Sequence, residues 1–295
     1  MEVRIDEERI EKELQKKLSK RKFYIVWMVV GFLIIVIPCI VVHNIFNPVT
    51  MLLAVVGSLI GFSLILVGWI LYAKAGGEYM KHYKQSIVIP VVQAMYPGAV
   101  YLPWQGITQK EYEKMHLRSL GTARSFYRSE DLIKGRCKGI AFRQADVVIE
   151  HSSEQKHTVY EVDGQLREFE FAKPITGTVL LGKRGKLLDV QPGMHRIEFE
   201  NVEFNSKYDV YAEDEHSAFY IITPQFMEYL LMLYMYDDDI YMSFDGERLR
   251  LLQSGRGGVF EARGDLLSVS TQISNACNDL KQIEEVIDLL HLEAQ

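Results

Sequence analysis

The feature that most constrains this chain is a block of 51 consecutive residues, Phe23 to Ala73, that contains no Asp, Glu, Lys or Arg. Within it, residues 23–42 and 49–73 form apolar runs, each long enough to cross roughly 30 Å of hydrocarbon at about 1.5 Å per residue. A soluble core helix normally keeps a polar face, which these runs lack. We therefore predict a transmembrane helical hairpin over 23–73. The average composition, 48% apolar with a net charge of −6, would suit a soluble protein and conceals this hairpin.

The distribution of Lys and Arg predicts the orientation of the hairpin. Basic residues crowd the entry to the first span and follow the second, whereas the connection, residues 43–48, has none (Lys16, Lys17, Lys20, Arg21, Lys22, Lys74, Lys81 and Lys84). By the positive-inside rule, both termini are cytoplasmic and the protein crosses the membrane twice. Residues 1–22 are expected to form an amphipathic helix. Its basic end can contact anionic lipid headgroups, although the topology alone requires the same residues.

Small residues follow one stripe of the second span, at Ala54, Gly57, Gly61 and Gly68. Such residues let two helix backbones approach closely inside a membrane. The partner is either the first helix of the same hairpin or a second copy of the chain. We favour the first helix, because the short turn already makes the two helices neighbours.

The remaining 222 residues are predicted to form a cytoplasmic α+β domain. Their net charge is −8, because the first 22 residues carry +2 of the total, and this argues against nucleic acid as a partner. Short strand patterns punctuated by Gly and Pro alternate irregularly with helical patterns, which indicates a mostly antiparallel sheet packed against helices. The predicted organisation is 1–22, an N-terminal segment; 23–73, the hairpin; 74–264, the α+β domain; and 265–295, a C-terminal helix.

Turn and cap signals place the elements of this domain. Pro90 should kink or break a helix over 78–95, and Thr108 with Glu111 should open a helix that reaches Leu120. Strands are predicted at 139–149, 178–181 and 196–204, with hairpins at Asp163-Gly164, between 158–162 and 167–171, and at Asp245-Gly246, between 240–244 and 249–252. Thr223 is the expected N-cap of a helix over 226–235.

The C-terminal segment has the most regular apolar pattern in the chain. Its apolar residues step alternately by three and four, which keeps them on one seam of a helix (Leu266, Val269, Ile273, Ala276, Leu280, Ile283, Ile287 and Leu290). Two interpretations stay open: a coiled coil with a second copy, or packing across the domain's own sheet. The flanking positions lack the paired charges that usually select coiled-coil partners.

Sequence motifs that would indicate a catalytic, nucleotide-binding or metal site are weak. The stretch Gly177 to Lys183 fits GxxxxGK, but Arg184 stands where Mg²⁺ binding needs Ser or Thr, so we expect a strand rather than a nucleotide site. An acidic cluster of Asp214, His216, Asp237 and Asp239 could supply metal or catalytic groups. Asp214 has a simpler use as a helix N-cap, and no spacing typical of a metal motif appears. We assign no catalytic residue, cofactor or metal.

Several segments stand in a moderately specific order and spacing. They are Glu130-Asp131-Leu-Ile-Lys-Gly135, Phe204-Asn-Ser-Lys-Tyr-Asp-Val-Tyr-Ala-Glu-Asp-Glu, Ala218-Phe-Tyr-Ile-Ile-Thr-Pro-Gln-Phe-Met, Met242-Ser-Phe-Asp-Gly and Phe260-Glu261. With the hairpin, they resemble a bacterial membrane-anchored family, domain of unknown function 3137, over about residues 80 to 262. The resemblance implies a bacterial cell membrane protein without an established activity, and it makes a LemA-type membrane protein a candidate partner. It carries no functional residues.

The sequence thus favours a membrane-anchored interaction or scaffold protein, without an identifiable catalytic activity, that faces the cytoplasm. Its expected partners are the lipid bilayer, another protein, and a second copy through the membrane or C-terminal helices. The alternative is a membrane-associated enzyme that uses the acidic cluster. A pocket that unites Asp214, His216 and Asp239 would favour the enzyme.

Overall fold

The computed structural model describes residues 6–44, 47–118, 125–152, 158–170, 174–186, 189–234, 239–255, 258, 260–261 and 268–290. Compactness divides the chain into two units. One comprises Val91–Phe260 and Asn275–Gln295, and the other comprises Glu2–Pro90 and Glu261–Ser274. The architecture is α+β, with an apolar two-helix hairpin followed by a domain built on one large antiparallel sheet, as predicted.

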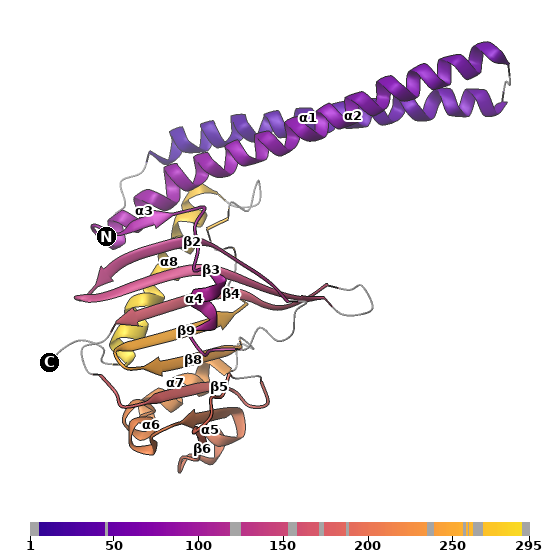
Figure 1. Cartoon of the computed structure of the whole chain (residues 1–295). Coiled ribbons are helices and arrows are strands. Elements are labelled where there is room, and N and C mark those ends of the chain that lie inside the picture. The colour runs from indigo at the N-terminus through magenta and orange to yellow at the C-terminus, as the bar shows by residue number, and fades with distance from the viewer. Residues whose placement is uncertain are drawn as a thin grey trace. The chain divides into compact units, whose positions relative to one another are not determined.

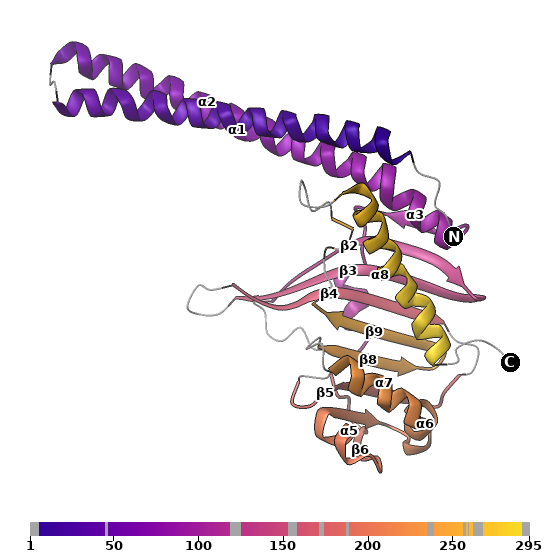
Figure 2. The same cartoon turned by 180° about the vertical axis from the view of Figure 1, so that it is seen from behind.

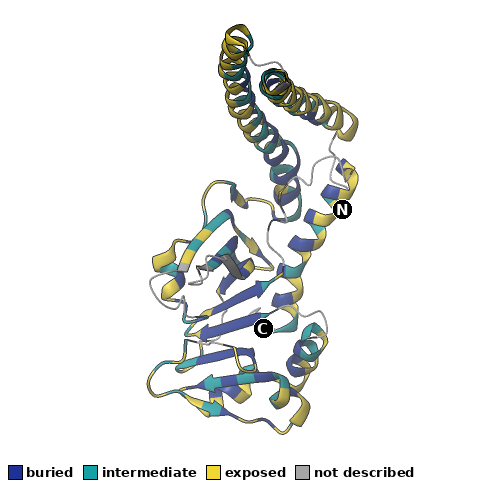
Figure 3. Ribbon diagram, turned by 90° about the vertical axis from the view of Figure 1, so that its right-hand side faces the viewer, coloured by how far each residue is buried: buried dark blue, intermediate teal, exposed yellow. Residues whose placement is uncertain are grey.

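The hairpin consists of α1 (Glu7–Asn44) and α2 (Pro48–Tyr83), which lie side by side (Figure 1). Asn47 caps α2: its side chain accepts a hydrogen bond of 2.8 Å from the backbone N–H of Thr50. Most side chains of the uncharged block are exposed, which Figure 3 shows as yellow along both helices. Both helices are long and apolar enough to cross a membrane. They also extend beyond the uncharged runs, since α1 begins 16 residues before Phe23.

The two helices remain paired beyond the uncharged block. Leu14 and Leu18 of α1 and Ala75 and Tyr79 of α2 are buried there. The helical path then changes at a π-helix, η1 (Lys84–Val88), before α3 (Ile89–Met95). The helix predicted to kink or break at Pro90 does not break there, because α3 follows η1 directly and continues through Pro90. A proline has no N–H to donate to the preceding turn, and a π-turn is one way to accommodate that loss.

Within the described residues, nine strands form a single antiparallel sheet in the order β1-β2-β3-β4-β9-β8-β5-β7-β6 (Figure 1). The strands are β1 (Val100–Leu102), β2 (Ser125–Cys137), β3 (Ile140–Ser152), β4 (Thr158–Glu170), β5 (Thr178–Lys183), β6 (His195–Ile197), β7 (Tyr208–Ala212), β8 (Ile240–Asp245) and β9 (Arg248–Ser254). The central strands are largely buried (Figure 3).

Helices cover both faces of this sheet. They are α4 (Gln109–Glu113), α5 (Val202–Lys207), α6 (Glu215–Ile221), α7 (Pro224–Tyr234) and α8 (Val269–Leu289). Figure 2 shows α7 and the second half of α8 on one face, and Figure 1 shows α4 on the other. On the α4 side, alternate strand residues join one core with the segment that surrounds α4 (Ile107, Tyr112, Met115, Leu117, Leu132, Ala145, Val147, Ile149, Val162, Leu166, Tyr241 and Leu252).

The predicted hairpin at Asp163-Gly164 is wrong, because β4 runs without a turn from Thr158 to Glu170. Gly164 has a different structural role. It pairs with Ser254 of β9, and a Cβ at this position would lie 2.0 Å from the carbonyl oxygen of Gln253. Glycine therefore permits a close approach of two backbones here. Phe171, the predicted end of the second strand, lies outside the described residues.

Two other predicted boundaries are wrong. The strand expected over 196–204 ends at Ile197, and Asn201 caps the short helix α5 instead. The helix that begins after Thr108 has the predicted capping box but ends at Glu113. His116 has a φ of 49°, and Met115 and Leu117 turn into the core. Burial of these two side chains outweighs the local helical pattern.

Other predictions are confirmed. Asp245 and Gly246 lie at the turn between β8 and β9, with Gly246 at a φ of 58°. Thr223 Oγ1 accepts a hydrogen bond from the N–H of Phe226 at the start of α7. In α8, the seam residues Ala276, Leu280, Ile283 and Ile287 are fully buried within the single chain, so the domain's own sheet covers this part of the seam. Leu266 and Met235 lie outside the described residues.

Candidate functional site

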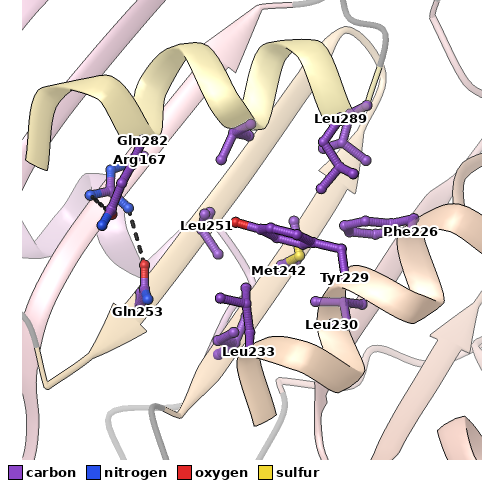
Figure 4. A pocket seen from close by; sticks show the side chains of 13 residues that line it. Arg167, Phe226, Tyr229, Leu230, Leu233, Met242, Leu251, Gln253, Gln282 and Leu289 are labelled. Carbon is purple, nitrogen blue, oxygen red and sulfur yellow. Dashed lines mark hydrogen bonds between the residues drawn. The ribbon is translucent and has the colours of Figure 1, made fainter. Parts of the chain in front are cut away.

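A pocket opens between α7 and α8 over strands β8 and β9 (Figure 4). It encloses about 470 Å³ of empty space, including open solvent at its mouth. Its walls are mostly apolar (Phe226, Leu230 and Leu233 of α7; Ile240, Met242 and Leu251 of the sheet; Val286 and Leu289 of α8, and Leu290 just after it). Ligand pockets commonly combine such walls with a few polar groups.

Arg167 provides the polar end of the pocket. Strand alternation places it on the α8 side of β4, beside Leu251 of β9, and only 1% of its surface is exposed. Its Nε donates to Gln144 Oε1 at 2.8 Å, and its Nη1 donates to Gln253 Oε1 at 3.2 Å. Nη2 donates to Gln282 Oε1 at 2.9 Å and also to Gln165 Oε1.

Asp279 of α8 supplies the negative charge opposite Arg167. One carboxylate oxygen lies 3.6 Å from Nη2, and the other accepts hydrogen bonds from the amides of Gln144 at 3.1 Å and Gln165 at 2.9 Å. Each amide therefore bridges the guanidinium and the carboxylate. We call Arg167, Asp279 and the four glutamines (Gln144, Gln165, Gln253 and Gln282) the arginine network. It holds α8 on the sheet and offers bound, satisfied groups rather than a free nucleophile or base.

A second buried carboxylate, Asp146, lies beside this network on β3. Burial raises its pKa well above the ordinary value, and the nearby charges of Asp131 and Asp279 raise it further. One carboxylate oxygen accepts a hydrogen bond of 3.0 Å from the N–H of Gly258. The other is buried without a partner among the described residues. Folding therefore makes the Asp146 carboxyl group harder to ionise than in the unfolded chain.

The structure separates the acidic residues that the sequence grouped together. Asp214 caps α6 as expected: it accepts hydrogen bonds from the N–H and hydroxyl of Ser217 at 3.0 and 2.7 Å. These bonds, the hydroxyl bond first, lower its pKa. Ser217 also donates to the carbonyl of Thr176, just before the start of β5. His216 is exposed in the first turn of the same helix.

Asp239 lies near the opposite end of β5. Its carboxylate is 2.7 Å from Nζ of Lys186 and 3.5 Å from Nζ of Lys183, the last residue of that strand. A strand of six residues spans about 17 Å at roughly 3.3 Å per residue. Asp214 and Asp239 therefore do not share one site. Asp237 lies outside the described residues, and no group of three potential metal ligands occurs among the described ones.

The glycines of the predicted membrane stripe lie against α1. A Cβ at Gly61 would be 2.5 Å from the carbonyl oxygen of Gly31, and one at Gly57 would be 3.3 Å from that of Ile34. At Gly68 the nearest atom would be Cγ of Met28, at 2.9 Å. Ala54, the fourth residue of the stripe, is partly exposed on α2. Packing within one hairpin thus occupies the three glycines.

The sequence reasoning missed the arginine network. Gln165 and Arg167 lie on either side of Leu166 in Gln165-Leu-Arg-Glu-Phe, a spacing of two that places both side chains on one face of a strand. The prediction of a turn at Asp163-Gly164 interrupted this alternation. Asp279 and Gln282, spaced three residues apart on α8, would have been a matching signal on the helix.

Comparison with known proteins places this site within a recognised region. The model of a family described as "Protein of unknown function (DUF3137)" matches residues 161–292. Residues 161–292 thus belong to this family. The match confirms the resemblance found in the sequence, and every residue that lines the pocket falls inside it. The description of DUF3137 names no activity.

Other similarities are distant. No curated protein matches the chain. One similar solved structure is the crystal structure of the mycobacterial trehalose monomycolate transport factor A, TtfA. It is 9% identical, with a TM-score of 0.39, and the alignment covers 73% of this chain and 98% of that one.

Proposed function

We propose that this DUF3137 protein is a non-enzymatic interaction protein, anchored in the bacterial cell membrane by its hairpin, with the sheet domain in the cytoplasm. The basic residues at the two cytoplasmic ends of the hairpin support this orientation. In this proposal, the pocket between α7 and α8 receives apolar side chains of a protein partner. A LemA-type membrane protein is the first candidate that the family resemblance offers.

The observation that carries the proposal is the combination of apolar walls with a polar end whose groups bind one another. Asp279 balances the charge of Arg167, so the pocket presents no net charge to attract an anionic substrate. Contact with this pocket therefore gains mainly from apolar burial, at about 25 cal/mol per Å². That is the chemistry of a hydrophobic anchor at a protein interface.

A paired substitution on α7 tests this function. Leu233 lines the pocket, whereas the neighbouring Met232 is 50% exposed and does not. Leu233→Trp should fill the pocket, and Met232→Trp adds the same side chain outside it. Proteins crosslinked to the full chain in native membranes are identified by mass spectrometry. We expect a specific partner to be lost from the Leu233→Trp variant and kept by the Met232→Trp variant.

Three results would contradict the proposal. The same partners recovered by both variants would show that the pocket does not bind them. Only a second copy of this chain in the crosslinks would indicate self-association instead. A small molecule released from the wild type and absent from the filled variant would indicate a ligand-binding protein. Circular dichroism of both variants checks that the fold is retained.

A further inference from the structure

Arg21 lies beside the start of the uncharged block, and its guanidinium is fixed against α2. Its Cζ lies 4.6 Å from the centre of the Tyr72 ring, and Nη2 donates a hydrogen bond of 2.8 Å to the Tyr72 hydroxyl. Gly76, one turn further along α2, lies beside the same guanidinium, because a Cβ there would be 3.6 Å from Cζ. We call Arg21, Tyr72 and Gly76 together the seat. A cation held in place in this way loses little conformational entropy when it binds an anion.

Among the residues that the structure describes, Arg21 forms no ion pair with a carboxylate. Between Glu13 and Glu78 the sequence contains no Asp or Glu. Among the described residues, Arg21 Nε is buried without a hydrogen-bond acceptor, and the hydrogen bond to Tyr72 goes to a neutral group. The Tyr72 hydroxyl accepts this hydrogen bond through its oxygen, so its own proton can be donated to another acceptor. The seat thus offers a positive charge and hydrogen-bond donors that are available to an anion.

The position of the seat indicates which anion it would meet. Arg21 and Tyr72 lie where the uncharged runs begin and end, the level of lipid headgroups if the hairpin spans a membrane. Trp69, one turn further into the block, is 61% exposed, as is typical of residues at a membrane interface. Lys17, one turn before Arg21, and Lys74 add positive charge nearby in the sequence. An arginine fork suits the oxygens of a phosphate group.

We propose that Arg21, Tyr72 and Gly76 form a binding site for the phosphate of an anionic phospholipid, in the leaflet on the side of the N-terminus. Arg21 Nη1 and the Tyr72 hydroxyl donate to the phosphate oxygens. The surrounding lysines favour a lipid with a net negative charge over a zwitterionic one. This inference rests on the membrane anchor of the proposed function and is independent of the pocket between α7 and α8.

Native mass spectrometry of the full chain, released from nanodiscs of phosphatidylcholine and phosphatidylglycerol, tests the site. Arg21→Gln removes the fork, and Gly76→Leu fills the seat without changing any charge. Lys16→Gln is the matched control, because it removes one charge from the same basic run. We expect the wild type to retain phosphatidylglycerol preferentially. Arg21→Gln should lower that preference at least about tenfold, because hydrogen bonds to a charged group are lost. Lys16→Gln should lower it about fivefold or less, the effect of one surface cation.

The outcomes separate the site from the anchor. Gly76→Leu should resemble Arg21→Gln, and Arg21→Lys should not restore the preference, because an ammonium lacks the planar fork. Equal effects of Arg21→Gln and Lys16→Gln would overturn the site in favour of general charge attraction. Competition by inorganic phosphate would overturn the lipid assignment in favour of a free anion. Failure to enter nanodiscs would overturn the anchor and the site together, whereas entry without a preference for phosphatidylglycerol would overturn the site alone.

Discussion

Neutralising Asp279 by Asp279→Asn changes the charge of one buried side chain while nearly preserving its shape. Asp279 is 5% exposed and Arg167 is 1% exposed, so their pairing takes place away from solvent. Asparagine can still accept the hydrogen bonds from Gln144 and Gln165 through its carbonyl oxygen. Its amide nitrogen, however, would then face the guanidinium. Arg167 would remain buried without a counter-charge, and breaking a buried pair in this way typically costs about 3–5 kcal/mol.

This cost is large beside the total stability of a domain, about 5–15 kcal/mol. The free energy of unfolding is measured by urea titration of the full chain in detergent micelles, followed by near-ultraviolet circular dichroism. The control is Glu198→Gln, which removes one of the two carboxylates that pair with Arg196, at a position where 72% of the glutamate side chain is exposed. An exposed pair contributes about 0–1 kcal/mol. If Asp279→Asn costs no more than this control, the arginine network does not hold α8 as argued.

Three further predictions concern the pH dependence, the sheet and the topology. The raised pKa of Asp146 means that its contribution to stability is present at low pH and decreases as the pH rises through the folded-state value. Asp146→Asn should therefore flatten the dependence of urea midpoints on pH. Gly164→Ala should cost about 1–3 kcal/mol by pushing β9 away, whereas Gly77→Ala, which meets no atom within 4 Å, should be neutral or stabilising in the same titration. In intact cells, a membrane-impermeant thiol reagent should label Asn47→Cys but not Glu228→Cys; the reverse pattern would contradict the proposed orientation.

The sequence predicted correctly those elements that depend on residues close together in the chain. A long segment without charged residues predicts the hairpin, because only helices and closed barrels satisfy every backbone polar group inside a membrane. Caps and turns act over three or four residues, which is why the structure reproduces Thr223, Asp214 and Asp245-Gly246 as predicted. The same reasoning applied to the helix after Thr108 located its start correctly. Its end depends on the burial of Met115 and Leu117, which is decided by strands distant in sequence.

Long-range pairing explains the remaining errors. Gly164 has the local signature of a turn, but the nearby backbone of β9 requires a residue without a Cβ at that position. The arginine network was missed for a similar reason, since its members come from β3, β4, β9 and α8. A single polar residue in a strand gives no indication of its partner. Only the order of strands in the sheet brings Gln144, Arg167 and Gln253 together.

The arginine network also explains why the seam of α8 packs on this sheet. Its apolar residues alone suit a coiled coil equally well, because any apolar face would bury Leu280 or Ile283. Asp279 removes this equivalence. It is buried beside that seam, and a partner that covers it must supply a positive charge and hydrogen-bond donors at the same depth. Arg167, Gln144 and Gln165 provide both from the domain's own strands, whereas a second copy of α8 would place another Asp279 near the same seam. One buried carboxylate can therefore select between two packings that the apolar pattern leaves equal.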